Sequence, residues 1–342
     1  MIRARGLTKT FTRGKETVEA VKGIDVDVSE GELVAFLGPN GAGKSTTLRM
    51  LTSLLQPTAG TATVAGYDVG THPAQVRARL GFIGQGNGGG FSYQVRDELH
   101  NQGRFYGLAP AEYKRRAAEL VEALELGGLE KRTVQSLSGG QRRRLDVALG
   151  LMNHPPLLFL DEPSTGLDPH ARANLWDHIV AMRERYGMTI VLTTHYLEEA
   201  DDMAERVVVI DHGEIVADAR PDVLKREHAD DVLTLTVRGG SADAVGAALA
   251  AVVGRDAPHP GEVTVSDGGT PDGSDGLRVR VATSHGSDRL PEAIEALRTA
   301  GLFTTSATSQ QASLDDVFLN LTGRSLREDS TMQQAARRED AA

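Results

Sequence analysis

Residues 33–46 read LVAFLGPNGAGKST. The first five are all apolar, which predicts a strand buried on both faces of a parallel sheet. Residues 38–45 match G-x-x-x-x-G-K-[ST], a phosphate-binding loop between a strand and a helix. Its glycines let the backbone wrap a phosphate, and the helix N-terminus favours an anion. We therefore expect Lys44 to reach the terminal phosphates of a nucleotide and Ser45 to ligate Mg²⁺.

The pattern on either side of this loop predicts an α/β fold with a mostly parallel sheet. Further buried strands are expected at 157–160, 189–193 and 207–210. Helical stretches are expected at 46–55, 111–126, 141–152 and 171–186. Residues 1–30 read as short strands with turns.

Two carboxylates follow the strand of residues 157–160, where the sequence reads LLFLDE. Adjacent residues at a strand end point in different directions, so the two side chains can hold separate positions. Asp161 suits a second-sphere or water-mediated ligand of Mg²⁺. Glu162 suits a general base that polarises the attacking water.

The segment LSGGQ, residues 137–141, precedes the helix at 141–152. Ser138 and Gln141 have the spacing of a capping box. Gly139 and Gly140 leave the helix N-terminus open, which provides a second anion-binding end.

The composition excludes several classes of protein. The chain has 342 residues and a formal net charge of −10, which disfavours nucleic-acid binding because that depends on a basic face. It has no cysteine, so it has neither disulfides nor a thiolate site. It has no apolar run near the ~20 residues of a membrane span, and its start lacks a secretory signal. We expect a cytosolic protein that reaches a membrane only through a partner.

A second domain is expected at 229–325, after a first domain at 1–225. Its strands and helices follow the order βαββαβ, the split βαβ or ferredoxin-like pattern, with a flexible hairpin tip at 267–276. A last helix begins at Ser313 and carries an apolar stripe of Leu314, Val317, Phe318 and Leu321. Residues 326–342 are polar and expected to be disordered.

Taken together, residues 1–225 resemble the ATP-binding subunit of ABC transporters. The phosphate loop is followed by Gln85, by LSGGQ at 137–141, by the strand ending in Asp161 and Glu162, by STGLD at 164–168, and by His195. The loop residues expected to contact ATP are Gly38, Asn40, Gly41, Ala42, Gly43, Lys44, Ser45 and Thr46.

The resemblance implies a head-to-tail dimer with two ATP molecules between the subunits. The segment Ser138, Gly139, Gly140 and Gln141 of one subunit would then cap the γ-phosphate bound at Lys44 of the other. Gln85 would contact Mg²⁺ and the attacking water. Asp168 would communicate across the interface, and His195 would hold the γ-phosphate. Phe11 lies where the family stacks an aromatic ring on adenine, with packing in the core as the alternative.

Two local features refine the resemblance. Residues 86–99 (GNGGGFSYQVRDEL) are richer in glycine than is usual after the glutamine, in a region where the family contacts its membrane partner. Residues 313–323 (SLDDVFLNLTG) are similar to the ending of drug-export ATPases of the daunorubicin-resistance type. That helix could equally dock on its own domain or serve contact between subunits.

The expected function is therefore an ATP-hydrolysing motor for a separately encoded integral membrane permease, exporting a drug or other hydrophobic or amphiphilic compound. It would lie at the cytoplasmic face of the membrane, held there by the permease. The alternative is a soluble ABC-type ATPase that remodels a ribosome or nucleic-acid complex. The sequence has a single phosphate loop and no long coiled coil between Gln85 and Ser138. Both features argue against the remodelling ATPase. An import ATPase is a weaker alternative, because residues 229–310 do not read as a β-barrel.

Overall fold

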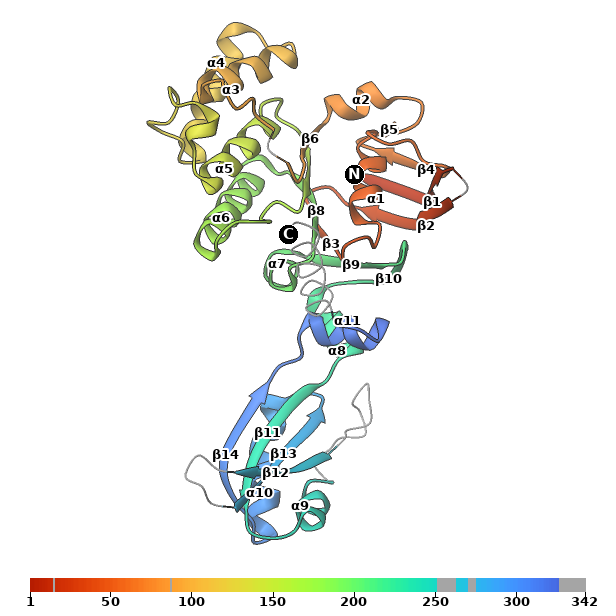
Figure 1. Ribbon diagram of the computed structural model, residues 1–342, viewed down its shortest axis with the longest axis vertical. Coiled ribbons are helices and arrows are strands. Elements are labelled where there is room, and N and C mark those ends of the chain that lie inside the picture. Colours follow the sequence, from red (N-terminus) through yellow and green to blue (C-terminus); the bar gives the residue numbers. More distant parts are fainter. Residues whose placement is uncertain (15, 87, 251–262, 270–274, 326–342) are drawn as a thin grey trace. The chain divides into compact units, whose positions relative to one another are not determined.

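The computed structural model describes residues 1–14, 16–86, 88–250, 263–269 and 275–325 (Figure 1). The chain divides into two compact units, Met1–Asp218 and Ala219–Ala342. The boundary expected near residue 225 is displaced, because helix α8 (Pro221–His228) packs inside the second unit against α11 (Leu314–Thr322). The expected disordered tail, 326–342, lies outside the described residues.

The first unit is built on a six-stranded sheet with the order β10-β9-β3-β8-β7-β6 (Figure 1). Its strands are β3 (Leu33–Leu37), β6 (Leu80–Ile83), β7 (Leu157–Asp161), β8 (Thr189–Thr194), β9 (Arg206–Asp211) and β10 (Glu214–Ala219). Strands β9, β3, β8, β7 and β6 run parallel. Every position of β3, β7 and β8 is buried, as a strand covered on both faces requires. The expected parallel α/β sheet is confirmed.

A second sheet of this unit is antiparallel, with the order β2-β1-β4-β5. It contains β1 (Ile2–Arg13), β2 (Glu16–Val28), β4 (Ala59–Val64) and β5 (Tyr67–Asp68). The expectation of short strands at residues 1–30 was wrong, since β1 and β2 form one long ladder. Its register shifts between Ala4 and Leu7, where Gly6 has a φ of 56°. Such a bulge interrupts the alternation of side chains, so a continuous strand reads as broken.

Helix α1 (Lys44–Leu51) lies between the two sheets and contacts strands of both. Its Leu48, Met50 and Leu51 belong to the core that the two sheets share. The helix ends earlier than expected, because Ser53 takes a left-handed φ of 56°.

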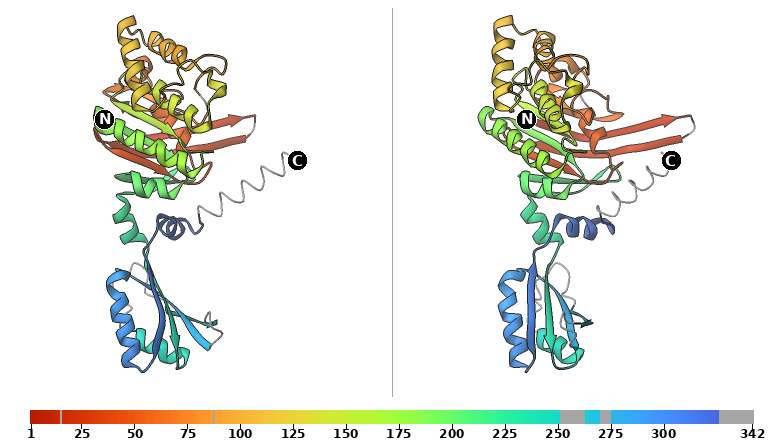
Figure 2. Two further views of the ribbon diagram at one scale, coloured as in Figure 1. Left: turned by 90° about the vertical axis from the view of Figure 1, so that its left-hand side faces the viewer. Right: turned by 60° about the vertical axis from the view of Figure 1, so that its left-hand side comes forward.

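The remaining helices of the first unit include those expected from the sequence. They are α2 (Pro73–Ala78), α3 (Val95–Phe105), α4 (Pro110–Ala123), the 3-10 helix η1 (Val134–Ser136), α5 (Gly139–Gly150), α6 (Pro169–Tyr186) and α7 (Leu197–Met203). Helix α5 contacts α3, α4, α6 and β6, so it joins the helical region to the parallel sheet (Figure 2).

The second unit holds the βαββαβ order expected from the sequence. Its elements are β11 (Asp231–Arg238), α9 (Ala242–Leu249), β12 (Val263–Gly269), β13 (Asp275–Thr283), α10 (Gly286–Thr299) and β14 (Phe303–Gln310). The sheet has the order β12-β13-β11-β14, with every neighbouring pair antiparallel. Alternate residues Leu233, Leu235 and Val237 of β11 are buried in a core with α9 and α10. Within the expected hairpin tip, residues 270–274 lie outside the described residues.

Helix α11 begins where the sequence places it. Ser313 caps the helix and forms a capping box with Asp316. Leu314, Val317 and Phe318 of the apolar stripe are buried. The Nδ2 of Asn320 donates to the carbonyl of His228 at 2.8 Å, so α11 docks on α8 of its own unit.

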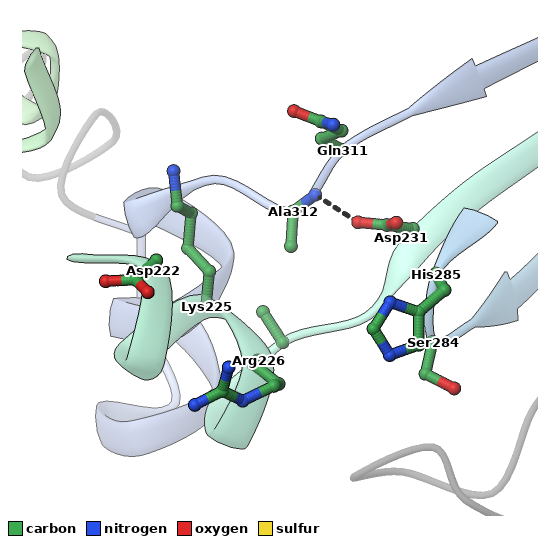
Figure 3. A pocket seen from close by; sticks show the side chains of 9 residues that line it. Asp222, Lys225, Arg226, Asp231, Ser284, His285, Gln311 and Ala312 are labelled. Carbon is green, nitrogen blue, oxygen red and sulfur yellow. Dashed lines mark hydrogen bonds between the residues drawn. The ribbon is translucent and has the colours of Figure 1, made fainter. Parts of the chain in front are cut away.

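A pocket of about 330 Å³ lies in the second unit beside α8 (Figure 3). Its lining residues are Asp222, Lys225, Arg226, Ala229, Asp231, Ser284, His285, Gln311 and Ala312. The Asp231 carboxylate accepts hydrogen bonds from the backbone N–H of Gly286 at 2.7 Å and of Ala312 at 2.8 Å. One side chain therefore connects the start of β11, the start of α10 and the segment leading to α11.

Within the part of the chain that the structure describes, no helix combines the length and apolar character needed to cross a membrane.

Candidate functional site

The loop of residues 38–45 joins β3 to α1 and depends on glycine at two positions. A Cβ added to Gly38 would lie 2.1 Å from the carbonyl oxygen of Ile210. Gly43 has a φ of 106°, and a Cβ there would lie 2.5 Å from the carbonyl oxygen of Ala20. The loop is thus pressed against β9 and β2 so closely that only glycine fits.

Lys44 is buried at the first position of α1, with 3% of its side chain exposed. Its Nζ donates to the carbonyl oxygens of Gly38 at 2.7 Å and Pro39 at 2.9 Å. Burial lowers the pKa of the ammonium, although the carboxylates of Glu162 and Asp161 oppose this shift. The loop therefore encloses the Lys44 ammonium group, which the sequence predicts to contact a phosphate.

Ser45, Asp161 and Gln85 come together beside the loop. The Ser45 hydroxyl donates to Oδ1 of Asp161 at 2.8 Å, and Nε2 of Gln85 donates to the same hydroxyl at 3.3 Å. Asp161 also accepts a hydrogen bond from Thr193 Oγ1 at 2.7 Å. Each of these side chains offers an oxygen ligand of the kind that Mg²⁺ prefers.

Glu162 follows β7 and faces the loop. Its φ of 49° is left-handed, and its backbone N–H donates to Oγ1 and to the carbonyl oxygen of Thr193, both at 3.1 Å. One carboxylate oxygen lies 3.9 Å from Lys44 Nζ, and the other lies 3.4 Å from His195 Nδ1. Thr165 Oγ1 donates to that second oxygen at 3.3 Å.

The surroundings of Glu162 decide its ionisation. Burial acts to raise the pKa of its carboxyl, but His195, Lys44 and Thr165 stabilise the charged form and hold that pKa below its ordinary value. Glu162 is therefore a carboxylate at neutral pH, which is the form a general base must have.

His195 reaches Glu162 because β7 and β8 are neighbouring parallel strands. Asp161 is the register partner of Thr193, so the two carboxyl ends of these strands meet at one edge of the sheet. The His195 ring also packs on the ring of Tyr196, with centroids 4.2 Å apart.

The LSGGQ segment forms the start of α5. Ser138 Oγ accepts from the backbone N–H of Gln141 at 3.2 Å, and Oε1 of Gln141 accepts from that of Ser138 at 3.1 Å, which completes the expected capping box. Asp168 caps the adjoining helix α6 by accepting from the N–H of Ala171 at 2.9 Å. Both caps are exposed, so the structure leaves these helix starts accessible.

Comparisons with known proteins agree with this geometry. A family model described as ABC transporter matches residues 21–165. The whole chain is 38% identical to the daunorubicin/doxorubicin resistance ATP-binding protein DrrA of Streptomyces peucetius, and the match covers 98% of that protein. The chain belongs to the ABC transporter ATP-binding proteins.

Other relatives of this ABC protein extend the match. It is 33% identical to the linearmycin resistance ATP-binding protein LnrL of Bacillus subtilis (strain 168), over 96% of this chain and all of that protein. Its fold is similar to a dimeric ATP-binding cassette bound to ADP and Pi in a post-hydrolysis state, with a TM-score of 0.60 and 27% identity over 64% of this chain and 98% of the other. The chain is an ATP-binding ATPase of ABC fold.

The other ATP-contact candidates of this ABC ATPase lie along the loop and the antiparallel sheet. Ala42 is buried, Thr46 is half-buried, and Asn40 and Gly41 are exposed. Phe11, on β1, is 43% exposed, so packing in the core does not account for it. Lys9 Nζ lies 5.2 Å from the centre of its ring.

Two residues of the site escape sequence reasoning. Thr193 holds both Asp161 and the backbone of Glu162. Glu199 is buried in α7 and accepts hydrogen bonds from Ser164 and, at 2.8 Å, from Thr194. Thr193 could have been found from the two threonines that precede His195, because hydroxyl side chains are unusual at the end of a buried strand. No comparable signal marks Glu199.

Proposed function

We propose that this ATPase drives the export of a drug or other hydrophobic or amphiphilic compound through separately encoded permease subunits at the cytoplasmic face of the membrane. The observation that carries the proposal is the match over nearly full length to proteins named for resistance to daunorubicin, doxorubicin and linearmycin. The alternative, remodelling of a ribosome or nucleic-acid complex, is not favoured by these relatives or by the net charge of −10.

The phosphate end of ATP is assigned to the loop and Lys44. Ser45, Gln85 and Asp161 would hold Mg²⁺ there, directly or through water, and their oxygen atoms suit that ion. Bound Mg²⁺ neutralises charge on the phosphate oxygens.

Hydrolysis is assigned to Glu162 as the base that orients and polarises the attacking water. The low pKa of Glu162 and its contact with His195 support this role. His195 would donate to the γ-phosphate through its other ring nitrogen. Gln85, exposed next to Ser45, would contact the same water.

A second copy of the chain would complete each site. Ser138, Gly139, Gly140 and Gln141 of one copy would cap the γ-phosphate held by the other, with Asp168 beside them at the interface. The exposed start of α5 supports this, because its free backbone N–H groups favour an anion. The match to a dimeric cassette supports it as well. Phe11 would stack on adenine.

The test is complementation of a strain that lacks this protein, with doxorubicin, which is fluorescent, as the probe. Wild type should restore low accumulation of the drug, whereas Glu162→Gln should not. In parallel, the chain should co-purify in mild detergent with a protein that has several membrane spans. Ribosomal or nucleic-acid complexes in place of a membrane protein, with drug accumulation unchanged by wild type, would overturn the export proposal and leave the ATPase.

A further inference from the structure

A buried ion pair lies on α5, one to two turns after the start of that helix at Gly139. Nη1 of Arg143 lies 3.6 Å from Oδ2 of Asp146, and 8% and 4% of their side chains are exposed. Burial lowers the pKa of Arg143 and raises that of Asp146. A pair of apolar residues would fill such a position with less loss of solvation. Packing alone therefore does not explain why two charged side chains occupy this position.

All three backbone partners of this pair belong to the catalytic loops. Nη1 of Arg143 donates to the carbonyl of Gly84 at 2.8 Å, and Nε donates to that of Pro163 at 2.5 Å. Oδ1 of Asp146 accepts from the N–H of Gly88 at 2.9 Å. Gly84 and Gly88 lie on either side of Gln85, and Pro163 follows Glu162 directly.

We propose that Arg143 and Asp146 are positioning residues that hold Gln85 and Glu162 in place for hydrolysis and link them to the start of α5. This inference rests on the roles proposed above for Gln85 and Glu162. Because the pair contacts both loops and sits in the helix that Ser138 caps, a shift of that helix is transmitted to both side chains at once. Neither residue touches the phosphate loop through any hydrogen bond or ion pair found among the described residues.

The chain provides a matched control in Arg116 of α4. Its side chain is also buried, with 1% exposed, and is paired with Glu119 at 3.4 Å. It donates to the carbonyl of Leu151 at 2.9 Å and to the hydroxyl of Tyr186 at 2.8 Å. These partners lie at the ends of α5 and α6, away from Gln85 and Glu162. Loss of Arg116 should affect stability without a selective effect on hydrolysis.

The decisive variant replaces the pair by apolar residues of similar size, Arg143→Met with Asp146→Leu, in the full-length protein. We expect kcat for ATP hydrolysis to fall about 10-fold or more, with ATP affinity within about 3-fold of wild type. Hydrogen exchange at the Gly88 amide should accelerate, because its acceptor is gone. Arg116→Met should lower the unfolding midpoint while leaving both kcat and Gly88 exchange near wild type.

If the double variant has the same kcat and the same Gly88 exchange rate as wild type, the proposal is overturned. A parallel loss of kcat, ATP affinity and unfolding midpoint would overturn it as well, since that is the pattern of a purely structural pair. If the double variant does not fold, Arg143→Lys and Asp146→Asn take its place. Lysine lacks the planar fork by which Nε and Nη1 of Arg143 reach the carbonyls of Pro163 and Gly84, so kcat should fall about 3-fold or more at an unchanged midpoint, and Asn should keep Gly88 protected. A wild-type kcat in Arg143→Lys, together with faster Gly88 exchange in Asp146→Asn, would contradict the proposal.

Parallel assays of Gln85→Ala and Glu162→Gln separate this inference from the proposed function. If neither substitution lowers kcat, the proposed roles of Gln85 and Glu162 fail. Gly88 exchange in the double variant still reports whether the pair holds the loop.

Discussion

Lys44 Nζ lies 3.9 Å from Oε1 of Glu162, across the gap between the phosphate loop and the end of β7. The buried Lys44 ammonium and the half-buried Glu162 carboxylate thus face each other at the position where we propose that the terminal phosphate meets its attacking water. Each charge lowers the cost of burying the other, so the Lys44 ammonium and the Glu162 carboxylate oppose the effect of burial on each other's pKa.

Glu162→Gln should nearly stop hydrolysis, with a loss of about 10²-fold or more in kcat, while ATP stays bound. Glutamine keeps the shape and the hydrogen bond from Thr165 but cannot accept a proton. ATP turnover and ATP affinity measured on one preparation test this, and size-exclusion chromatography with ATP should reveal a trapped dimer. Turnover at the wild-type rate would remove Glu162 from the role of base.

Lys44→Ala should weaken ATP binding itself, because the only buried ammonium of the loop is lost from the phosphates. We expect a loss of about 10-fold or more in affinity, measured with a fluorescent ATP analogue. Lys22→Ala is the control, since Lys22 is exposed and contacts Glu214 at 3.8 Å in a pair worth little. Equal affinities for the two variants would argue against the loop as the phosphate site.

The pH dependence of hydrolysis should reflect the lowered pKa of Glu162. A carboxyl whose pKa is lower in the folded state than in the unfolded state contributes stability at pH values above its unfolded-state pKa. That stability is lost as the pH falls through its folded-state pKa. Because its surroundings hold the pKa of Glu162 below that of an ordinary glutamate, the base should stay ionised wherever an ordinary glutamate does, with no loss of kcat from this group at mildly acidic pH. In His195→Ala the opposing effect of burial remains, so the acid limb should move to higher pH. Normalised pH profiles of kcat that superimpose for wild type and His195→Ala would contradict this prediction.

Ser138→Ala should affect both the helix and the ATP site of a second copy. Loss of the capping box costs about 1 kcal/mol. Ser313→Ala removes the equivalent capping box of α11 and provides the matched control. Both variants should lower the unfolding midpoint, but only Ser138→Ala should reduce ATP-dependent dimerisation, measured by light scattering. A similar effect of both on dimerisation would count against the role of the LSGGQ serine.

Asp231→Ala should destabilise the second unit, because two backbone N–H groups lose their acceptor. The expected cost is about 1–3 kcal/mol, measured by denaturant unfolding with hydrogen exchange to locate the change. Asp231→Asn keeps an acceptor oxygen and should cost less. Asp243→Ala, an exposed residue in the first turn of α9, is the control and should change stability by a few tenths of a kcal/mol. Equal stability of all three variants would show that Asp231 does not connect the segments.

Prediction from the sequence succeeded where one short segment carries its own explanation. The apolar run of β3, the glycine loop, the capping box at Ser138 and the start of α11 at Ser313 are local, so their residues report their structure directly. The long ladder of β1 and β2 was missed because a bulge near Gly6 breaks its alternation. The unit boundary was misplaced because nothing in residues 219–228 signals that α8 pairs with a helix about 90 residues later.

By itself, the sequence determined that the chain is a nucleotide-binding α/β protein of ABC type, because each motif is a contiguous run whose chemistry depends on local geometry. Only the tertiary structure decided what surrounds those motifs. Thr193 supports Asp161, His195 contacts Glu162, and Arg143 joins the two loops, each across 20 to 60 residues of chain. Such contacts depend on the register of parallel strands and on helix packing. No local pattern of residues encodes either one.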